Sequence, residues 1–265
     1  LSLLQRGNAS MKRIDEVMDE RSEIISKADA ARLFVPRGEI EFRDINFRYE
    51  NQTEWVLKGI TLKIPAGQRV AIVGPIGSGK STLASMLSRM IPVSDRSLFI
   101  DGVDINTIDI KILRRHIGYV PQDTFLFSER ITDNLLFGVE TAGGGNDVEE
   151  LARMAGIESE IQELPYRYES YLGERGINLS GGQKQRITIA RALAINPNII
   201  ILDDCLSAVD ARVEEIIIKN ILQKFPGRTM LVVTHRLPAV RNFDMIVVMQ
   251  DGMIVEKGTH EQLIK

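Results

Sequence analysis

The stretch RVAIVGPIGSGKS, residues 69–81, decides the fold. Its first five residues, Arg69 to Val73, are mostly apolar and predict a strand. The turn that follows matches G-x-x-x-x-G-K-[ST], a loop between strand and helix that wraps phosphate groups. Its glycines let backbone N–H groups point inward, and a helix starting near Ser81 offers its positive end to an anion. Lys80 is expected to reach the outer phosphates, and the Ser81 hydroxyl to ligate Mg²⁺.

Such a loop needs an acidic partner on a neighbouring strand, and the apolar run 199–202 ends in one, Asp203. The run predicts a buried strand, and α/β sheets bind ligands at the carboxyl ends of their strands. Asp203 is therefore expected to hold Mg²⁺, largely through water. An apolar run ending in Asp is weak evidence alone, and the loop strengthens it. The predicted phosphate-binding residues are Gly74, Pro75, Ile76, Gly77, Ser78, Gly79, Lys80, Ser81 and Thr82.

The bulk composition is that of an ordinary globular chain. Of 265 residues, 44% are apolar and 26% charged, and the formal net charge of -3 argues against a dedicated nucleic-acid binder. Cys205 is the only cysteine, so no internal disulfide can form and a reducing compartment is expected. No apolar run reaches the roughly 18 residues of a membrane span, and no signal peptide is visible. The chain opens on Leu1, so we expect a piece of a longer protein.

Hydrophobic patterning predicts an α/β fold, because helices and strands alternate through the last third of the chain. Short antiparallel strands are predicted before the glycine-rich loop, and residues 124–194 are predicted to be mostly helical. Residues 1 to about 23 predict a helix, with a linker over residues 19–39. The predicted helices are Ile131–Phe137, Asp147–Ala155, Gln183–Leu193 and Ala211–Phe225, and the predicted late strands are Thr229–Thr234, Met245–Met249 and Met253–Glu256. Gly143-Gly144-Gly145 separates the first two helices, and Gln250-Asp251-Gly252 predicts a hairpin turn.

Leu179-Ser180-Gly181-Gly182-Gln183 opens the helix that continues through Arg191. A serine and two glycines at a helix N-terminus form a second anion site. One triphosphate does not need two such sites, so the second site is expected to serve a nucleotide held by another subunit. A plain helix cap is the alternative.

The pentapeptide LSGGQ is the signature motif of the ABC ATPase family, which this sequence closely resembles. The family's other characteristic motifs appear here in the same order along the chain. Tyr49 matches the aromatic residue that stacks on adenine, with an ordinary strand aromatic as the alternative. Gln122 matches the glutamine that touches the metal and senses the membrane domain. Ser207-Ala208-Val209-Asp210 matches the D-loop, which crosses the dimer interface, and His235 matches the switch histidine that contacts the γ-phosphate. An isolated His or Gln would more often be structural.

The resemblance covers residue 38 to the end. It implies a P-loop NTPase with a RecA-like α/β core, an antiparallel β subdomain and an α-helical subdomain, about 124–194, that carries the LSGGQ signature. It implies ATP and Mg²⁺ as cofactors and a second nucleotide-binding domain as partner. The residues implied in catalysis are Asp204, His235, Gln122 and Lys80. The implied metal ligands are Ser81, Gln122 and Asp203, and the residues implied to reach the partner's nucleotide are Ser180, Gly181, Gly182 and Gln183.

Two features resemble the exporters of this family. Gly173-Glu174-Arg175-Gly176 resembles a segment that contacts the intracellular helices of the membrane domain. Residues 1–37 resemble the cytoplasmic end of the last transmembrane helix with its linker, with a simple helix packed on the core as the alternative. The resemblance therefore implies a transmembrane domain in the same polypeptide, coupling helices from a partner, and a place at the cytoplasmic face of a membrane, the bacterial inner membrane by expectation.

Asp204 departs from the family pattern, in which Glu follows the Mg-binding Asp. The Glu is taken to position the attacking water, and Asp reaches less far by roughly 1.5 Å. A misplacement of about 1 Å can cost on the order of 10²-fold in rate, so slow hydrolysis is expected. A backbone shift that lets Asp serve adequately is the alternative. Residues 202–210 resemble the degenerate-site subunit of bacterial heterodimeric exporters, in which one of two composite sites is impaired.

Two other functions stay open at this point. The first is a non-transport ABC ATPase, against which the exporter-like segments argue. The second is a nucleotide-binding regulatory module with little turnover, which Asp204 keeps open and the presence of Lys80 and His235 disfavours.

Overall fold

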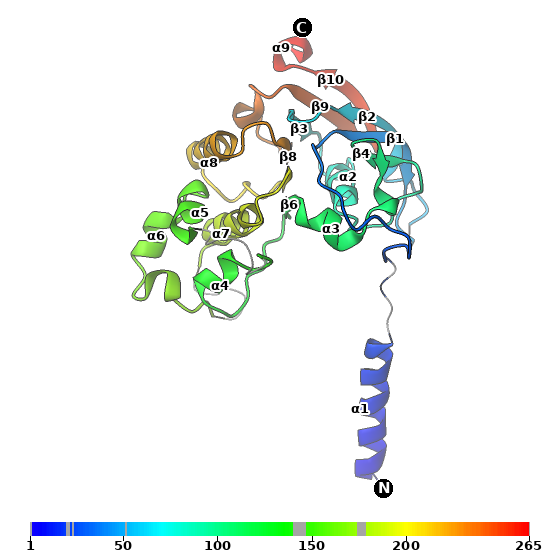
Figure 1. Ribbon diagram of the computed structural model, residues 1–265, viewed down its shortest axis with the longest axis vertical. Coiled ribbons are helices and arrows are strands. Elements are labelled where there is room, and N and C mark those ends of the chain that lie inside the picture. The colour runs from blue at the N-terminus through cyan, green and yellow to red at the C-terminus, as the bar shows by residue number, and fades with distance from the viewer. Residues whose placement is uncertain are drawn as a thin grey trace.

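The computed structural model describes residues 2–19, 22, 24–50, 52–139, 147–173 and 179–264 of the chain. Within this part, six strands form the central sheet in the order β10-β9-β3-β8-β7-β6 (Figure 1). Five of them are parallel: β3 (Arg69–Val73), β6 (Ile117–Val120), β7 (Ile199–Asp203), β8 (Thr229–Val233) and β9 (Met245–Gln250). The edge strand β10 (Met253–Gly258) pairs antiparallel with β9 across the turn at Asp251 and Gly252.

A second, antiparallel sheet has the strand order β2-β1-β4-β5 in the described residues. Burial alternates along β1 (Ile40–Phe47) and β2 (Leu57–Ile64), because one face of this sheet packs on the core and the other meets water. Ile40 lies opposite both Ile64 and Ile100, which fixes β1 between β2 and β4. The remaining strands are β4 (Leu98–Ile100) and β5 (Val103–Asp104).

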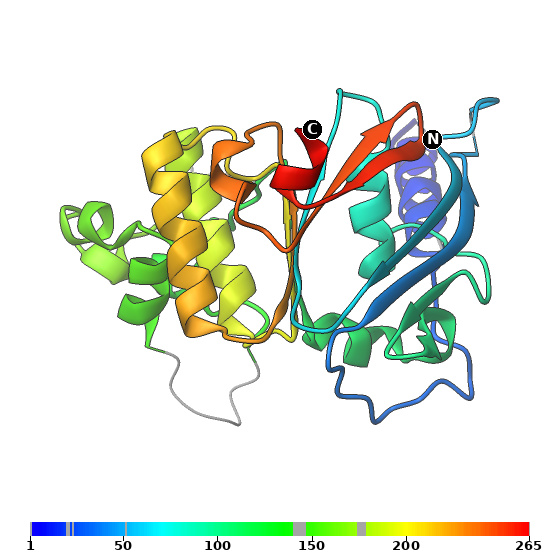
Figure 2. The same cartoon turned by 90° about the horizontal axis from the view of Figure 1, so that it is seen from above.

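Alternate residues of β3 face different layers. Val70 and Ile72 join a hydrophobic core with β1, β2 and helix α2 (Lys80–Leu87). Ala71 and Val73 join another core with helices α7 (Gly181–Ala194) and α8 (Ala211–Lys224). Seen from above, α2 lies between the two sheets, and α7 and α8 cover the opposite face of the central sheet (Figure 2). The P-loop strand is therefore held on both faces.

The helical region projects from the central sheet beyond α7 (Figure 1). Its core includes side chains from α4, α5 and α7. Asn134, which is fully buried in α4, receives a hydrogen bond from Arg191 of α7, and so fixes the two helices together. The helices here are α4 (Ile131–Leu135), α5 (Val148–Met154) and α6 (Glu158–Gln162), with the 3₁₀ turn η2 (Arg167–Glu169).

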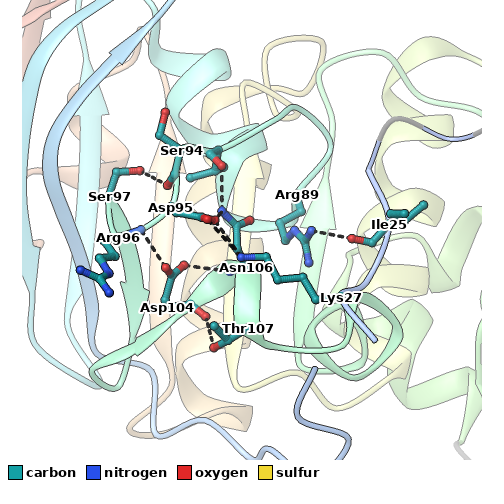
Figure 3. A network of polar contacts seen from close by, with 11 residues as sticks. Ile25, Lys27, Arg89, Ser94, Asp95, Arg96, Ser97, Asp104, Asn106 and Thr107 are labelled. Atoms are coloured by element: carbon teal, nitrogen blue, oxygen red, sulfur yellow. Dashed lines mark hydrogen bonds and ion pairs between the residues drawn. The ribbon is translucent and has the colours of Figure 1, made fainter. Parts of the chain in front are cut away.

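The linker after helix α1 (Ser2–Met18) lies along the domain, while α1 itself extends away from it (Figure 1). Arg89, buried just after α2, donates hydrogen bonds to the carbonyl oxygens of Ile25 and Ile108 at 3.0 and 3.3 Å. Lys27 pairs with Asp95 at 3.1 Å, in the polar network of Figure 3. The network ties the linker to the far end of the P-loop helix. None of the described helices is long and apolar enough to cross a membrane.

The α/β architecture predicted from the alternation of elements is confirmed, and the strands 69–73 and 199–203 match their predicted bounds. The first helix ends at Met18 and not near Glu23. Tyr49 lies beyond the end of β1 at Phe47. Several elements were not predicted because runs this short show no period: β4, β5, β6, α3 (Ile110–Arg115), α9 (His260–Leu263) and the 3₁₀ turns η1 (Ile105–Thr107) and η4 (Pro238–Val240). Both α6 and η2 lie within residues 124–194, which were predicted to be mostly helical without individual bounds. The glycine run 143–145 lies outside the described residues.

Candidate functional site

The glycine-rich loop joins β3 to α2, as its pattern predicts. Gly74 has φ 150°, and a Cβ there would collide with the carbonyl oxygen of Met249. Gly79 caps α2 with φ 93°, and a Cβ would approach Leu57 to 2.7 Å. These positions require glycine both for backbone conformation and for space. Within the loop, Pro75, Ile76 and Gly77 are exposed, whereas Ser78 and Thr82 are buried.

Lys80 is the cation of the loop, and only 6% of it is exposed. Its ammonium group donates to the carbonyl oxygens of Gly74 and Pro75 at 2.9 and 2.6 Å. Burial lowers the pKa of Lys80, while the nearby Asp204 and Asp203 carboxylates act to raise it. The side chain is thus folded back over the loop, where an anion would compete with the two carbonyls for it.

Asp203 ends β7 beside the start of α2. Its Oδ1 accepts a hydrogen bond from the Ser81 hydroxyl at 2.7 Å, and its Oδ2 accepts one from the Tyr119 hydroxyl at 2.9 Å. Burial raises the pKa of Asp203 and that of Tyr119. Ser81 and Asp203 together offer two hard oxygen ligands at the phosphate-binding loop, a donor set that suits Mg²⁺ held mainly by substrate phosphates and water. No cluster of three or more His, Cys, Asp or Glu suited to a metal occurs in the described residues.

Asp204 and His235 contact each other directly. The Nε2 of His235 lies 3.0 Å from Asp204 Oδ2, and the histidine side chain is 42% exposed against 11% for the carboxylate. His235 follows β8, which lies between β3 and β7 in the sheet. Asp204 has φ 46°, a left-handed conformation that Asp tolerates better than most residues. The next residue, Cys205, is buried in the core, as expected for a small filler.

Gln122 leaves β6 at the same edge of the sheet. Val120 pairs with Leu202, so Gln122 lies just past the strand end that adjoins Asp203. Its side chain is exposed. Parallel register thus brings the ends of β3, β8, β7 and β6 side by side.

Tyr49 lies beside the P-loop helix and not in the core. It is 40% exposed, its hydroxyl lies 3.2 Å from the Thr82 hydroxyl, and its ring meets Phe47 edge-on at 5.0 Å. An exposed ring face next to the phosphate-binding loop is the geometry that stacking on a base requires.

The signature residues form a helix cap at the start of α7. The Ser180 hydroxyl accepts from the Gln183 backbone N–H at 3.3 Å, and the Gln183 side chain accepts from the Ser180 N–H at 2.9 Å. Ser180 and Gly181 are exposed. A Cβ on Gly182 would lie 3.1 Å from the carbonyl oxygen of Ala208, so this helix start packs against the residues of the D-loop. Within this chain the Ser180 hydroxyl caps α7.

The structure therefore assembles the predicted residues into two groups. The P-loop, Asp203, Asp204, His235 and Gln122 meet at one edge of the central sheet, with Tyr49 alongside. Ser180 to Gln183 lie elsewhere, at the start of α7. Of the exporter-like segment 173–176, residues 174–176 lie outside the described residues.

Sequence reasoning missed Tyr119 and Arg236. Tyr119 lies three residues before Gln122, and nothing in the sequence there signals a hydroxyl bonded to Asp203. Arg236 directly follows His235, and its partners lie 22 to 29 residues away in sequence. The place of Arg236 next to His235 in the sequence was the signal that could have pointed to it.

Comparisons with known proteins agree with this geometry. A family model described as ABC transporter matches residues 57–207. The probable multidrug resistance ABC transporter ATP-binding/permease protein YheI of Bacillus subtilis is 43% identical over 264 residues, 100% of this chain and 45% of that protein. The ATP-dependent lipid A-core flippase of Desulfotalea psychrophila is 40% identical, over 100% of this chain and 46% of that protein.

A solved structure of a bacterial Atm1-family ABC exporter with ATP bound superposes with a TM-score of 0.89 and 36% identity. The superposition covers 98% of this chain and 46% of that one. The chain thus spans about half the length of the relatives it matches.

Proposed function

This chain belongs to the ABC transporter family, of which it holds the ATP-binding domain, and we propose that it is one half of a two-domain ATPase that drives export across a membrane. The observation that carries the proposal is the hydrogen bond between Ser81 and Asp203, which joins the P-loop to the acidic end of β7. That bond brings together the two oxygen ligands that a Mg-ATP site needs.

Nucleotide binding falls to the P-loop and Tyr49. Residues Gly74 to Thr82 would surround the phosphates, with backbone N–H groups and the positive end of α2 stabilising their charge. Lys80 would exchange its bonds to Gly74 and Pro75 for stronger, charge-assisted bonds to phosphate oxygens. Tyr49 would stack on the adenine ring from the exposed side of its own ring.

Ser81, Asp203 and Gln122 are the proposed metal ligands. When bound, Mg²⁺ neutralises charge on the outer phosphates. Tyr119 holds Asp203 Oδ2, which leaves Oδ1 directed at Ser81 and the loop. Tyr119 therefore orients the carboxylate for the metal, in the way that outer hydrogen-bond partners commonly orient ligands.

Hydrolysis at this site would depend on Asp204 and His235. Asp204 would orient the attacking water and accept its proton, and His235 would contact the γ-phosphate. The 3.0 Å contact between them means that the short carboxylate still reaches the histidine. Its reach toward water remains one methylene less than that of Glu, so we propose that turnover here is slow.

The exposed signature supports a dimer. Ser180 to Gln183 would bind the γ-phosphate of a nucleotide on the partner domain, using the positive N-terminal end of α7. This chain's P-loop and Asp204 would in turn form the impaired site with the partner's signature. The arrangement that follows is a heterodimer with one slow and one competent site.

A groove between the central sheet and the helical region is the proposed docking place for the membrane domain. It measures about 410 Å³ and includes Pro121 and Asp123, which flank Gln122, with the exposed rings of Phe125 and Phe137. An apolar end of a helix from a transmembrane domain would fill it, and Gln122 would sense its position. We propose that residues 1–37 continue from that membrane domain, that residues 38–265 form the ATPase, and that it lies at the cytoplasmic face of the membrane.

The experiment compares the full-length protein containing this sequence with Asp203→Asn, which keeps the shape of the side chain and one of its two acceptor oxygens and loses the charge. We expect Mg-dependent hydrolysis at this chain's own site to fall on the order of 10²-fold, because charge on the transferred phosphate is left less stabilised. Asp251→Asn, an exposed turn position, serves as the matched control. ATP binding without Mg-dependent hydrolysis in the wild type would favour the regulatory module instead, and unchanged Mg-dependent hydrolysis at this chain's own site in Asp203→Asn would refute the site.

A further inference from the structure

Arg236, the residue after His235, holds the D-loop, residues 207–210, through hydrogen bonds from its guanidinium. One terminal nitrogen donates to the carbonyl oxygen of Val209 at 2.7 Å, and the other donates to that of Ser207 at 2.8 Å. The two acceptors flank Ala208. The planar fork of arginine suits two acceptors that lie side by side, which the ammonium of lysine cannot match.

A buried carboxylate fixes the position of this fork. Glu214 of α8 is 1% exposed, and its Oε2 lies 3.2 Å from the guanidinium of Arg236. Burial raises the pKa of Glu214, and the Arg236 partner acts against that rise. Separating Arg236 from Glu214 would leave a buried carboxylate unpaired, so Glu214 keeps the guanidinium in place. Arg236 is therefore fixed from α8 and reaches outward to the D-loop.

The D-loop connects this clamp to both groups of site residues. On one side, the Ser207 hydroxyl donates to the carbonyl oxygen of Asp204 at 3.0 Å, and Asp204 contacts His235. On the other side, the Ala208 carbonyl oxygen faces Gly182 at the start of the signature helix. The path from His235 to the signature thus runs along the D-loop, whose Ser207 and Val209 carbonyls Arg236 holds.

We propose that Arg236 is a positioning residue that couples this chain's own nucleotide site to its signature, and so to the site on the partner. This inference rests on the proposed function and adds a route by which the two sites communicate. When His235 follows the γ-phosphate, its contact with Asp204 and the bond from Ser207 to Asp204 pass the movement to the D-loop, which Arg236 holds together at Ser207 and Val209. The D-loop in turn shifts against Gly182 and the start of α7. Arg236 itself touches no nucleotide.

The test replaces Arg236 by Lys in the full-length protein assembled with its partner. Lysine keeps a cation beside Glu214, so the fold is retained, but it cannot hold Ser207 and Val209 at once. We expect kcat for ATP hydrolysis to fall between about 10-fold and 10²-fold, because the signature is misplaced at the competent site. The dissociation constant for ATP should change less than about twofold, since the P-loop is untouched. Arg241→Lys, the same change at an exposed nearby position, should match the wild type.

A second variant separates positioning from folding. Glu214→Gln removes the buried charge but leaves an oxygen that accepts from the Arg236 guanidinium. We therefore expect this variant to keep most of the kcat that Arg236→Lys loses. Its melting temperature falls if the buried charge pair contributes to folding. Unchanged kcat in Arg236→Lys would overturn the proposal. So would an ATP dissociation constant that weakens in step with kcat, which would make Arg236 a binding residue. A wild-type protein that binds no ATP would instead contradict the proposed function beneath it.

Discussion

At the scale of single residues, Lys80 is a nearly fully buried cation, with 6% of it exposed. Replacing it by Ala should weaken ATP binding at least about tenfold, since the phosphates would lose a charge-assisted partner contributing roughly 1.5 kcal/mol or more. Titration of the chain with Mg-ATP measures the change. Lys58→Ala, at an exposed position of β2, should bind as the wild type does. Undiminished affinity in Lys80→Ala would remove the basis for the phosphate site.

Tyr49 gives a second residue-scale prediction. Tyr49→Ala should weaken ATP binding by about 1 kcal/mol through lost stacking, whereas Tyr49→Phe should change it little, because the ring is kept and only the bond to Thr82 is lost. Tyr166→Ala, at a tyrosine that is 75% exposed, is the matched control. Equal losses in the Ala and Phe variants would mean that the hydroxyl, and not the ring face, makes the contribution.

At the scale of elements, Asp244 fastens the start of β3 to the loop before β9. It accepts from the Arg69 backbone N–H at 2.8 Å and pairs with the Arg69 guanidinium at 2.5 Å. The hydrogen bond from the Arg69 side chain lowers the pKa of Asp244. A lowered carboxyl pKa stabilises the fold at pH values above the unfolded pKa of about 3.9, and this contribution is lost as the pH falls through the folded pKa.

Asp244→Asn should therefore lower the free energy of unfolding by about 1 kcal/mol at pH 7, a value kept small because both side chains are about one third exposed. The difference from the wild type should begin to shrink below about pH 4, where the carboxyl group of the unfolded chain takes up a proton, and should be lost below the lowered folded pKa. Denaturant unfolding at several pH values measures this, with Asp29→Asn at an exposed position as control. A difference that stays constant down to pH 3 would show that charge is not its cause.

The cap at the start of the signature helix α7 also stabilises that helix on its own. Because Ser180 closes a capping box with Gln183, removing its hydroxyl costs α7 about 1 kcal/mol regardless of any nucleotide. A variant at this position thus tests both the cap and the proposed contact to the partner. Asn preserves the cap and is the replacement that isolates the contact.

At the scale of the whole molecule, the two groups of site residues should act on different nucleotides. In the assembled transporter, Ser180→Asn or Gly181→Ala should depress total ATPase activity more than Asp204→Ala does, because the signature serves the competent site. Asp204→Glu should raise hydrolysis at this chain's own site by supplying the missing methylene. Steady-state ATPase measurements on each variant decide the matter.

Melting temperatures provide the control for this comparison, since Glu must adopt the left-handed conformation of residue 204, with φ 46°. If Asp204→Ala silences the complex as fully as a signature change, the sites are not divided as proposed. The chain would then be an active half in which Asp serves in place of Glu.

The sequence by itself determined the glycine-rich loop and two of the central strands of this protein. The loop at residues 74–81 and the buried runs at 69–73 and 199–203 are contiguous, so local pattern is enough to identify them. Only the tertiary structure decided which distant groups meet: Tyr119 on Asp203, Arg236 on the D-loop, and Arg89 on the linker. Strand pairing and helix packing set these contacts, and neither the hydrophobic period nor residue type encodes a partner dozens of residues away.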